Sequence, residues 1–169
     1  MARRTMLLMA VGTLALAAMP SVQAGSVTLA TCFGQEATEV GTPAPDTLTG
    51  SPGRDVIFGD AGNDDVNGLG GNDLLCGGPG NDEIFGKAGR DRIAGQDGND
   101  SMIGGRGADR FLGGNGRDSA TGGPGDDLMR GGPGGDTLIG NGGFDTARGG
   151  PGLDGCLAER MSCEFFPGE

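Results

Sequence analysis

Carboxylates recur in this chain at a fixed spacing of nine residues. Aspartate occupies the whole series Asp55, Asp64, Asp73, Asp82, Asp91, Asp100, Asp109, Asp118, Asp127, Asp136, Asp145 and Asp154. A carboxylate can act as a general acid or base, or it can bind a hard cation. The chain has no His, and it contains neither an H-E-x-x-H nor a G-x-S-x-G motif, so no partner for hydrolytic chemistry accompanies the series. The pattern favours cation binding, and we expect no enzymatic activity.

Each of these aspartates is the sixth residue of a nine-residue unit. Counting from Gly50, the first and fourth places are Gly in all twelve units, which fill residues 50–157 without an insertion. The eighth place is apolar or small: Ile57, Val66, Leu75, Ile84, Ile93, Met102, Phe111, Ala120, Met129, Leu138, Ala147 and Cys156. A further unit at 41–49 keeps Gly41, Asp46 and Leu48 but has Ala44 at its fourth place. Such regularity indicates an ordered repeat, whereas a flexible Gly-rich linker would not need Asp in each unit.

The elements that position the aspartates must be turns and short strands. The first five places are rich in Gly and Pro, which are turn residues, and the last three alternate as a strand does. A three-residue strand is not stable alone, so the units must stack. Two units make one coil, and coils about 4.8 Å apart give two parallel sheets with the eighth-place side chains between them. The sequence predicts an all-β solenoid.

Stacking brings the aspartates into two rows, in which each Asp lies above the Asp two units away. Two carboxylates about 5 Å apart repel by roughly 0.8 kcal/mol even in bulk water, so the rows oppose folding unless a cation compensates. Calcium takes 6 to 8 oxygen ligands from carboxylates and carbonyls, whereas magnesium demands a tighter octahedron. Glycine turns present carbonyl oxygens beside each carboxylate. Several Ca²⁺ ions per chain are therefore the expected cofactor.

The complete motif is seen in units such as GGPGNDEIF (77–85), GGRGADRFL (104–112) and GGPGDDLMR (122–130). They resemble the hemolysin-type (RTX) calcium-binding nonapeptide, G-G-x-G-x-D-x-U-x with U apolar. The resemblance covers residues 41–157 and implies a right-handed parallel β-roll of two stacked sheets. It also implies that calcium lies between units n and n+2, held by the sixth-place Asp and by carbonyls of the turn glycines. Glycines of this kind are Gly77, Gly78, Gly80, Gly104, Gly105, Gly107, Gly122, Gly123 and Gly125. With its flanking segments, the chain resembles short secreted calcium-binding proteins of actinobacteria.

The repeat departs from this motif at two places. In the early units the second place is not Gly, at Ser51, Asp60, Leu69, Lys87 and Gln96, and we expect those turns to bind calcium less ideally. The eighth place is small at Ala120, Ala147 and Cys156. Because small side chains bury less apolar surface, the C-terminal coils should depend more on calcium.

The segments outside the repeat indicate export. Arg3 and Arg4 precede an apolar run that Pro20 ends, and Val22-Gln23-Ala24 fits a cleavage site, so residues 1–24 are interpreted as a signal peptide. The run is too short for a spanning helix, which disfavours a membrane anchor. We expect a secreted, extracellular protein without a transmembrane segment after cleavage, whose export route is either general or twin-Arg. Residues 25–40 are expected to form an N-terminal cap, and residues 158–169, with Phe165 and Phe166, a C-terminal cap.

Four cysteines in an exported chain indicate disulfides. The favoured pairs are Cys32–Cys76 and Cys156–Cys163, one at each end, although four cysteines allow three connectivities. A zinc site is disfavoured because the spacings are long and His is absent.

Charge and composition limit the classes of function that the chain can have. The formal net charge is −11, and removal of the two arginines in residues 1–24 makes it −13, which disfavours nucleic acid as a partner. Aromatic residues make up 4% of the chain, so apolar burial is small and the metal-free chain is expected to be disordered. The function that fits is a secreted, monomeric calcium-binding protein that folds on binding several Ca²⁺. The alternatives are an extracellular surface or matrix interaction module with structural calcium and an unidentified partner, or the remnant of a repeat-bearing secreted hydrolase.

Overall fold

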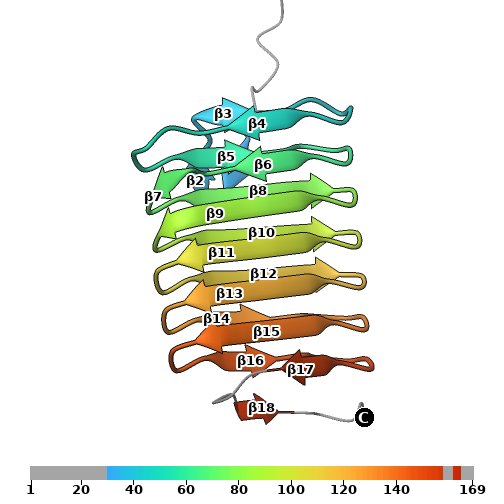
Figure 1. Ribbon diagram of the computed structural model, residues 1–169. Helices are drawn as coiled ribbons and strands as arrows, with labels where there is room; N and C mark the ends of the chain where they lie inside the picture. The colour runs from blue at the N-terminus through green and yellow to red at the C-terminus, as the bar shows by residue number, and fades with distance from the viewer. Residues whose placement is uncertain (1–29, 158–161, 165–169) are drawn as a thin grey trace, which may run out of the picture.

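The computed structural model describes residues 30–157 and 162–164, the last three by their backbone alone. Its regular elements are strands, which stack as a solenoid (Figure 1). Sheet 1 has the strand order β18-β16-β14-β12-β10-β8-β5-β3, and sheet 2 the order β17-β15-β13-β11-β9-β6-β4, with β7 also pairing with β9. The bounds in sheet 1 are β3 Glu39–Val40, β5 Val56–Phe58, β8 Leu74–Pro79, β10 Arg92–Asp97, β12 Arg110–Asn115, β14 Leu128–Arg130, β16 Thr146–Arg148 and β18 Ser162–Glu164. Those in sheet 2 are β4 Thr47–Thr49, β6 Asp65–Asn67, β7 Gly70–Gly71, β9 Glu83–Gly89, β11 Ser101–Arg106, β13 Ser119–Pro124, β15 Thr137–Gly142 and β17 Gly155–Leu157.

The register of both sheets follows the nonapeptide. In sheet 1, Ile93 is level with Leu75 on one side and Phe111 on the other, and all three occupy the eighth place. In sheet 2, Met102 pairs in the same way with Ile84 and Ala120. Every strand of these pairs is parallel to its neighbour, so two nonapeptides form one coil. The predicted all-β solenoid of two parallel sheets is confirmed.

A single apolar seam lies between the two sheets. It consists of the eighth-place side chains of residues 48–147, all buried, with Cys156 packed against its end. Burial of a large aliphatic or aromatic side chain contributes about 1.5–3 kcal/mol. Phe111 is the largest member, whereas Ala120 and Ala147 contribute little. The seam is one side chain wide, and it thins toward the C-terminal end.

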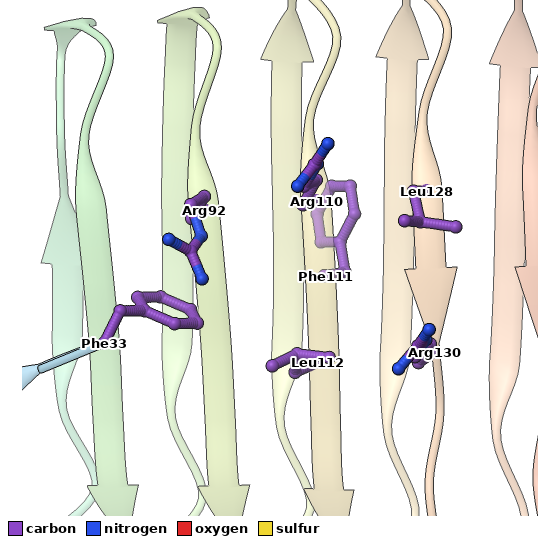
Figure 2. Close-up of a pocket in the computed structure, with 7 residues that line it drawn as sticks. All are labelled: Phe33, Arg92, Arg110, Phe111, Leu112, Leu128 and Arg130. Carbon is purple, nitrogen blue, oxygen red and sulfur yellow. The ribbon is translucent and has the colours of Figure 1, made fainter.

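The seventh- and ninth-place side chains face outward and form the two flat faces of the solenoid. On sheet 1 this outer face carries arginine and leucine side chains across β10, β12 and β14 (Figure 2). Nearer the N-terminus the same face is apolar, with Val56, Leu74, Cys76 and Ala94 all buried. These side chains are covered by the lead-in segment rather than by solvent.

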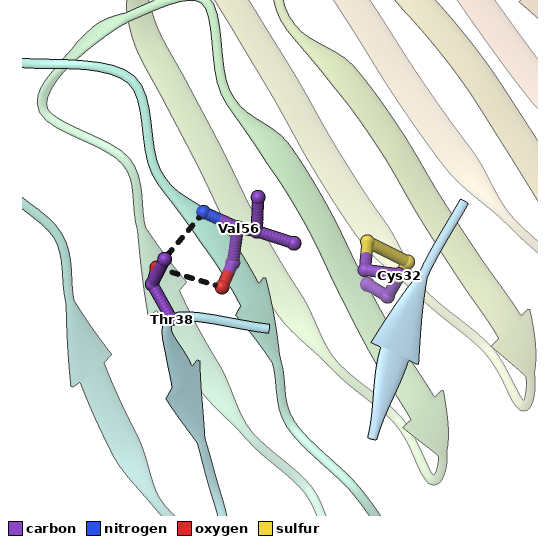
Figure 3. The surroundings of a disulfide bond; sticks show 4 residues. Cys32, Thr38 and Val56 are labelled. Carbon is purple, nitrogen blue, oxygen red and sulfur yellow. Dashed lines mark hydrogen bonds between the residues drawn. A yellow bond between two sulfur atoms is a disulfide. The ribbon is translucent and has the colours of Figure 1, made fainter. Parts of the chain in front are cut away.

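The lead-in segment lies on sheet 1 through a short antiparallel hairpin. Its strands are β1 Thr31–Cys32 and β2 Gln35–Glu36. Cys32 is fully buried, and its disulfide to Cys76, with Cα atoms 5.7 Å apart, joins the hairpin to β8 (Figure 3). Thr38 then exchanges two hydrogen bonds with the backbone of Val56: its Oγ1 accepts from the amide at 3.1 Å and donates to the carbonyl at 3.0 Å. The Cys32–Cys76 pairing predicted from the sequence is confirmed.

Other predictions fall on parts of the chain that are not described. The signal peptide (1–24), the start of the N-terminal cap and most of the C-terminal cap, including Phe165 and Phe166, lie outside the described residues. The side chain of Cys163 does as well, so the Cys156–Cys163 pairing stays a prediction. The described residues contain no helix of the length and apolarity needed to cross a membrane.

Candidate metal centre

The sixth-place aspartates form two columns that run the length of the solenoid. One column precedes the strands of sheet 2 and contains Asp46, Asp64, Asp82, Asp100, Asp118, Asp136 and Asp154. The other precedes the strands of sheet 1 and contains Asp55, Asp73, Asp91, Asp109, Asp127 and Asp145. The ten from Asp64 to Asp145 are at most 5% exposed, although Asp is almost never fully buried unless it is paired. A stack of buried carboxylates therefore requires a partner for each of them.

From Asp64 to Asp154, one oxygen of each carboxylate has its partner in the preceding coil. Oδ1 of Asp100 accepts a hydrogen bond from the backbone amide of Asp82 at 2.9 Å, and the amide of Asp100 donates in turn to Oδ1 of Asp118 at 3.0 Å. The same bond recurs eleven times, from the pair Asp46–Asp64 to the pair Asp136–Asp154, with lengths of 2.8–3.0 Å. Each bond spans 18 residues, which is one coil. These bonds fix the position of every carboxylate relative to the turn before it.

The second oxygen has no donor in most of the column. Oδ2 is buried and without a hydrogen bond in nine consecutive units, from Asp64 to Asp136. It lies against the first-place Gly of its own unit. A Cβ placed on Gly68 would be 2.6 Å from Oδ2 of Asp73 and 3.1 Å from the carbonyl oxygen of Gly86, the first-place Gly two units later. A carboxylate oxygen and a backbone carbonyl oxygen thus converge where a side chain is absent.

The first two units differ because their turns supply a donor. Oδ2 of Asp55 accepts from the amide of Ser51 at 2.7 Å and from its hydroxyl at 3.1 Å. Oδ2 of Asp46 accepts in the same way from the amide and hydroxyl of Thr42, at 2.6 and 2.8 Å. A second-place hydroxyl residue therefore folds back on the carboxylate, and the Oδ2 atom of each of these two aspartates has a donor.

From the next unit onward, the turn has a different backbone. The second-place residue has a positive φ from Asp60 (79°) to Gly150 (112°), including Lys87 (75°) and Gln96 (90°). Positive φ favours Gly, which explains why the motif prefers Gly at the second place. The backbone is strained where another residue occupies this place with a positive φ, as Lys87 and Gln96 do. At the fourth place, a Cβ on Gly80 would collide with the carbonyl oxygen of Gly62 in the coil below. Only Gly allows the turns to stack at this distance.

The fourth-place carbonyls are a further source of free oxygen. The carbonyl of Gly62 points along the solenoid axis at Gly80, and the carbonyl of Gly80 points in the same way at Gly98. Within the described part of the chain, neither carbonyl accepts a backbone hydrogen bond. Carbonyl oxygens without donors and carboxylate oxygens without donors are hard ligands of the kind that Ca²⁺ requires.

Burial dominates the electrostatics of the columns. It raises the pKa of Asp73, Asp82, Asp109 and Asp136 to about 6 and the pKa of Asp100 and Asp127 to about 7. Burial likewise raises the pKa of Asp64, Asp91 and Asp118. The backbone hydrogen bond to Oδ1 lowers these pKa values in part, and neighbouring carboxylates such as Asp82 and Asp118 beside Asp100 raise them further. Ionised carboxylates in this stack therefore carry a free-energy cost, which a bound cation would remove.

The structure places the predicted ligands as follows. Asp64 to Asp145 lie in the buried columns, Asp55 is satisfied by Ser51, and Asp154 ends its column partly exposed. Among the predicted glycines, the first-place residues Gly77, Gly104 and Gly122 lie against Oδ2 of the Asp in their own unit. The second-place residues Gly78, Gly105 and Gly123, and the fourth-place residues Gly80, Gly107 and Gly125, form the stacked turns. The described residues contain no cluster of three His, Cys, Asp or Glu side chains, so a cation here would take its other ligands from the backbone.

Sequence reasoning missed an asparagine ladder at the fifth place. Oδ1 of Asn63 accepts from the amide of Asn81, Oδ1 of Asn81 from that of Asn99, and Oδ1 of Asn99 from that of Arg117, at 2.8–2.9 Å. The recurrence of Asn directly before the sixth-place Asp was the available signal. This ladder holds successive turns together beside the column that contains Asp82 and Asp100.

Comparisons with known proteins agree with this geometry. The family model described as the RTX calcium-binding nonapeptide repeat (4 copies) matches residues 40–75, 77–111, 103–138, 112–147 and 130–155. These matches span the region in which the two Asp columns lie. A search of curated proteins gave no match.

Proposed function

The chain belongs to the family of RTX calcium-binding nonapeptide repeats, and from that premise we propose that it is a secreted protein whose repeat folds as it binds several Ca²⁺. The observation that carries the proposal is the run of nine buried Oδ2 atoms, from Asp64 to Asp136, that have no hydrogen-bond donor. Leaving a buried polar group without a partner costs about 1–3 kcal/mol, and more when the group is charged. A repeated cost of this size opposes folding unless each oxygen binds a cation.

The residues that would hold calcium are the aspartates of this run together with glycine carbonyls of the stacked turns. Each carboxylate is already oriented, because its Oδ1 is fixed by an amide of the previous coil and its Oδ2 faces the first-place Gly. When bound, the ion would supply the positive charge that the buried columns lack. The proposal assigns no such site to Asp46 or Asp55, because Thr42 and Ser51 satisfy their Oδ2 atoms.

Coupling between binding and folding follows from the small apolar core. The seam is one side chain wide, and the net charge is strongly negative. Binding to the folded state alone stabilises it by RT ln(1 + [L]/Kd), about 2.7 kcal/mol per site at a hundredfold excess over Kd. Several such sites would exceed the whole stability of an ordinary domain, which is about 5–15 kcal/mol.

Secretion is supported by two independent features. The N-terminal pattern of Arg3, Arg4, the apolar run and Ala24 is typical of a signal peptide. The buried Cys32–Cys76 disulfide is typical of oxidising compartments. We propose no catalytic role for the repeat, in which the aspartates are explained as ligands.

A calcium titration of the purified chain tests the proposal. We expect far-UV circular dichroism to change from coil to β as calcium is added, and isothermal titration calorimetry to report several ions per chain. Magnesium is the matched control and should produce little change, because it demands a tighter octahedron. A chain that forms its full β signal in chelator at about pH 8 would contradict the proposal.

A further inference from the structure

The outer face of sheet 1 carries an unbalanced group of arginines. Arg92 and Arg110 occupy the seventh place of adjacent strands in direct register, and Arg130 follows on β14. Leu112 and Leu128 lie between them, and all five side chains line one shallow groove, which Phe33 closes at one end (Figure 2). We name Arg92, Arg110, Leu112, Leu128 and Arg130 the arginine face.

Two of these arginines form no ion pair with a described carboxylate, although Asp126 borders a neighbouring hollow with Arg92 and Arg110. The outward places of β5 to β14 contain no Asp or Glu, and within the described part of the chain neither Arg110 nor Arg130 forms an ion pair. Arg92 lies over the ring of Phe33, at 4.2 Å from its centroid. Like charges on adjacent strands repel, so the arrangement costs stability in the isolated chain and is explained if an anionic partner lies on this face.

The outer face of sheet 2 has the opposite character. Asp65 and Glu83 occupy the seventh place of adjacent strands in direct register, and both are exposed. Phe85 and Ile103 lie beside them in the ninth place, also as direct neighbours. The outward places of β4 to β17 contain no Lys or Arg, although Nζ of Lys87, the second-place residue on β9, lies 4.4 Å from the Phe85 ring centroid. We name Asp65, Glu83, Phe85 and Ile103 the acidic face.

We propose that the partner of the arginine face is the acidic face of a second copy of this chain. The two faces lie on opposite sides of the solenoid, so both remain available in each copy. Each presents a pair of like charges at the seventh place of adjacent strands, about 4.8 Å apart, so the Arg92–Arg110 pair matches the Asp65–Glu83 pair in spacing. The flanking Leu112 and Leu128 meet Phe85 and Ile103 as apolar contacts. This proposal differs from the monomer expected from the sequence.

The strength and form of this association follow from the geometry. Each face spans three strands about 4.8 Å apart and the three residues of about 3.3 Å each from the seventh to the ninth place, which gives a contact of roughly 140 Å² per copy, whereas a stable interface buries about 800 Å² per partner. Each contact is therefore weak and sensitive to salt. Because two different faces meet, the contact is heterologous and does not close, so copies add to one another in an open stack.

A second copy fits better than a polyanion such as nucleic acid. The whole chain is strongly acidic, so a uniformly anionic polymer is repelled away from the arginine face, and Leu112 and Leu128 have no counterpart on a phosphate backbone. The repulsion between copies is reduced by calcium, which adds two charges per site; in this respect the inference rests on the proposed function. Association is expected in calcium and at high protein concentration.

Charge reversal on each face tests the contact. In sedimentation velocity with excess calcium, the weight-average mass of the wild type should rise with protein concentration and fall on addition of salt. Both R92E/R110E and D65K/E83K should associate at least about tenfold more weakly. An equimolar mixture of the two variants should associate again, because the intact acidic face of one variant meets the intact arginine face of the other and the two reversed faces also carry opposite charges.

The control is R106E/R117E, which changes the same number of exposed arginines outside the arginine face and should associate like the wild type. Circular dichroism in calcium shows separately whether each protein is folded, so a failure of calcium-dependent folding is recognised as such. A folded wild type that stays monomeric at every concentration would refute the contact. So would two variants that associate like the wild type, or a mixture that contains only monomers.

Discussion

Replacing Asp100 by Asn should change stability in opposite directions with and without calcium. Oδ1 of Asp100 accepts from the Asp82 amide, and its Oδ2 has no donor. Asparagine keeps an oxygen for the amide and removes the buried charge. Burial raises the pKa of Asp100 from 3.8 to about 7. At about pH 8 the ionised carboxylate thus costs the metal-free fold on the order of 4 kcal/mol, at 1.36 kcal/mol per pKa unit.

In calcium the balance reverses. The amide of Asn carries no charge to hold the ion, so the variant loses about one site, worth about 2.7 kcal/mol at a hundredfold excess over Kd. We therefore expect D100N to fold more readily than the wild type in chelator and to be less stable than the wild type in calcium. Urea unfolding followed by far-UV circular dichroism measures both, with an osmolyte added to bring metal-free folding into range.

The matched control is D55N, at the same place of an earlier unit. Oδ2 of Asp55 is satisfied by Ser51, so this variant should lose about 1 kcal/mol for a hydrogen bond and gain nothing in chelator. If D100N is less stable than the wild type in chelator as well as in calcium, the carboxylate of Asp100 does not carry an uncompensated charge in the metal-free fold. That result would refute the proposed role of Oδ2.

Three further predictions concern pH, the disulfide and the turns. Because burial raises the pKa of the column aspartates from 3.8 to about 6–7 in the fold, protonation stabilises the metal-free fold at low pH. That stabilisation is lost as the pH rises through about 6–7. In chelator, β content should therefore fall from about pH 4 to pH 7, whereas the affinity for calcium should rise over the same range. A β content in chelator that does not change with pH would contradict the burial of these charges. Reduction of the Cys32–Cys76 disulfide, which spans 44 residues, should lower the free energy of unfolding by on the order of 4 kcal/mol in the chain-entropy model. Amide hydrogen exchange should increase in β1 and β8 before it increases in the C-terminal strands. An equal increase in exchange in all strands would argue against a local role of the disulfide. Gln96→Gly should stabilise the calcium-bound fold by about 1 kcal/mol, because φ is 90° at this position. Gly80→Ala should disrupt the fold, because the new Cβ would meet the carbonyl of Gly62. Equal effects of the two variants on the midpoint of thermal unfolding would show that the glycines are not needed for backbone stacking.

The sequence was sufficient for every feature that repeats strictly. The period of nine placed the eighth-place side chains in the seam and the aspartates in two columns, since stacking leaves identical places above one another. It also favoured the Cys32–Cys76 pair, because export and an even number of cysteines left few connectivities. It did not show which carboxylate oxygen is satisfied, because that depends on the second-place residue: Ser51 folds back on Asp55, and Lys87 with a positive φ does not. Nor did it place the lead-in hairpin on the outer face of sheet 1, because that position depends on tertiary packing of Cys32 and Phe33 against Val56 and Leu74.

The hydrogen bonds within each column couple neighbouring sites. The amide of Asp82 is held by Asp100, and Oδ1 of Asp82 in turn holds the amide of Asp64. An ion that fixes one carboxylate therefore also fixes the turn before it, which contains the next ligand set. Stability in such a stack is a sum of unit terms and nearest-neighbour terms, so binding should propagate along a column once one site has formed. The thin part of the seam around Ala120 and Ala147 contributes least to the unit terms, whereas the disulfide holds the opposite end. Folding driven by calcium should consequently begin in the N-terminal coils and extend toward Asp136.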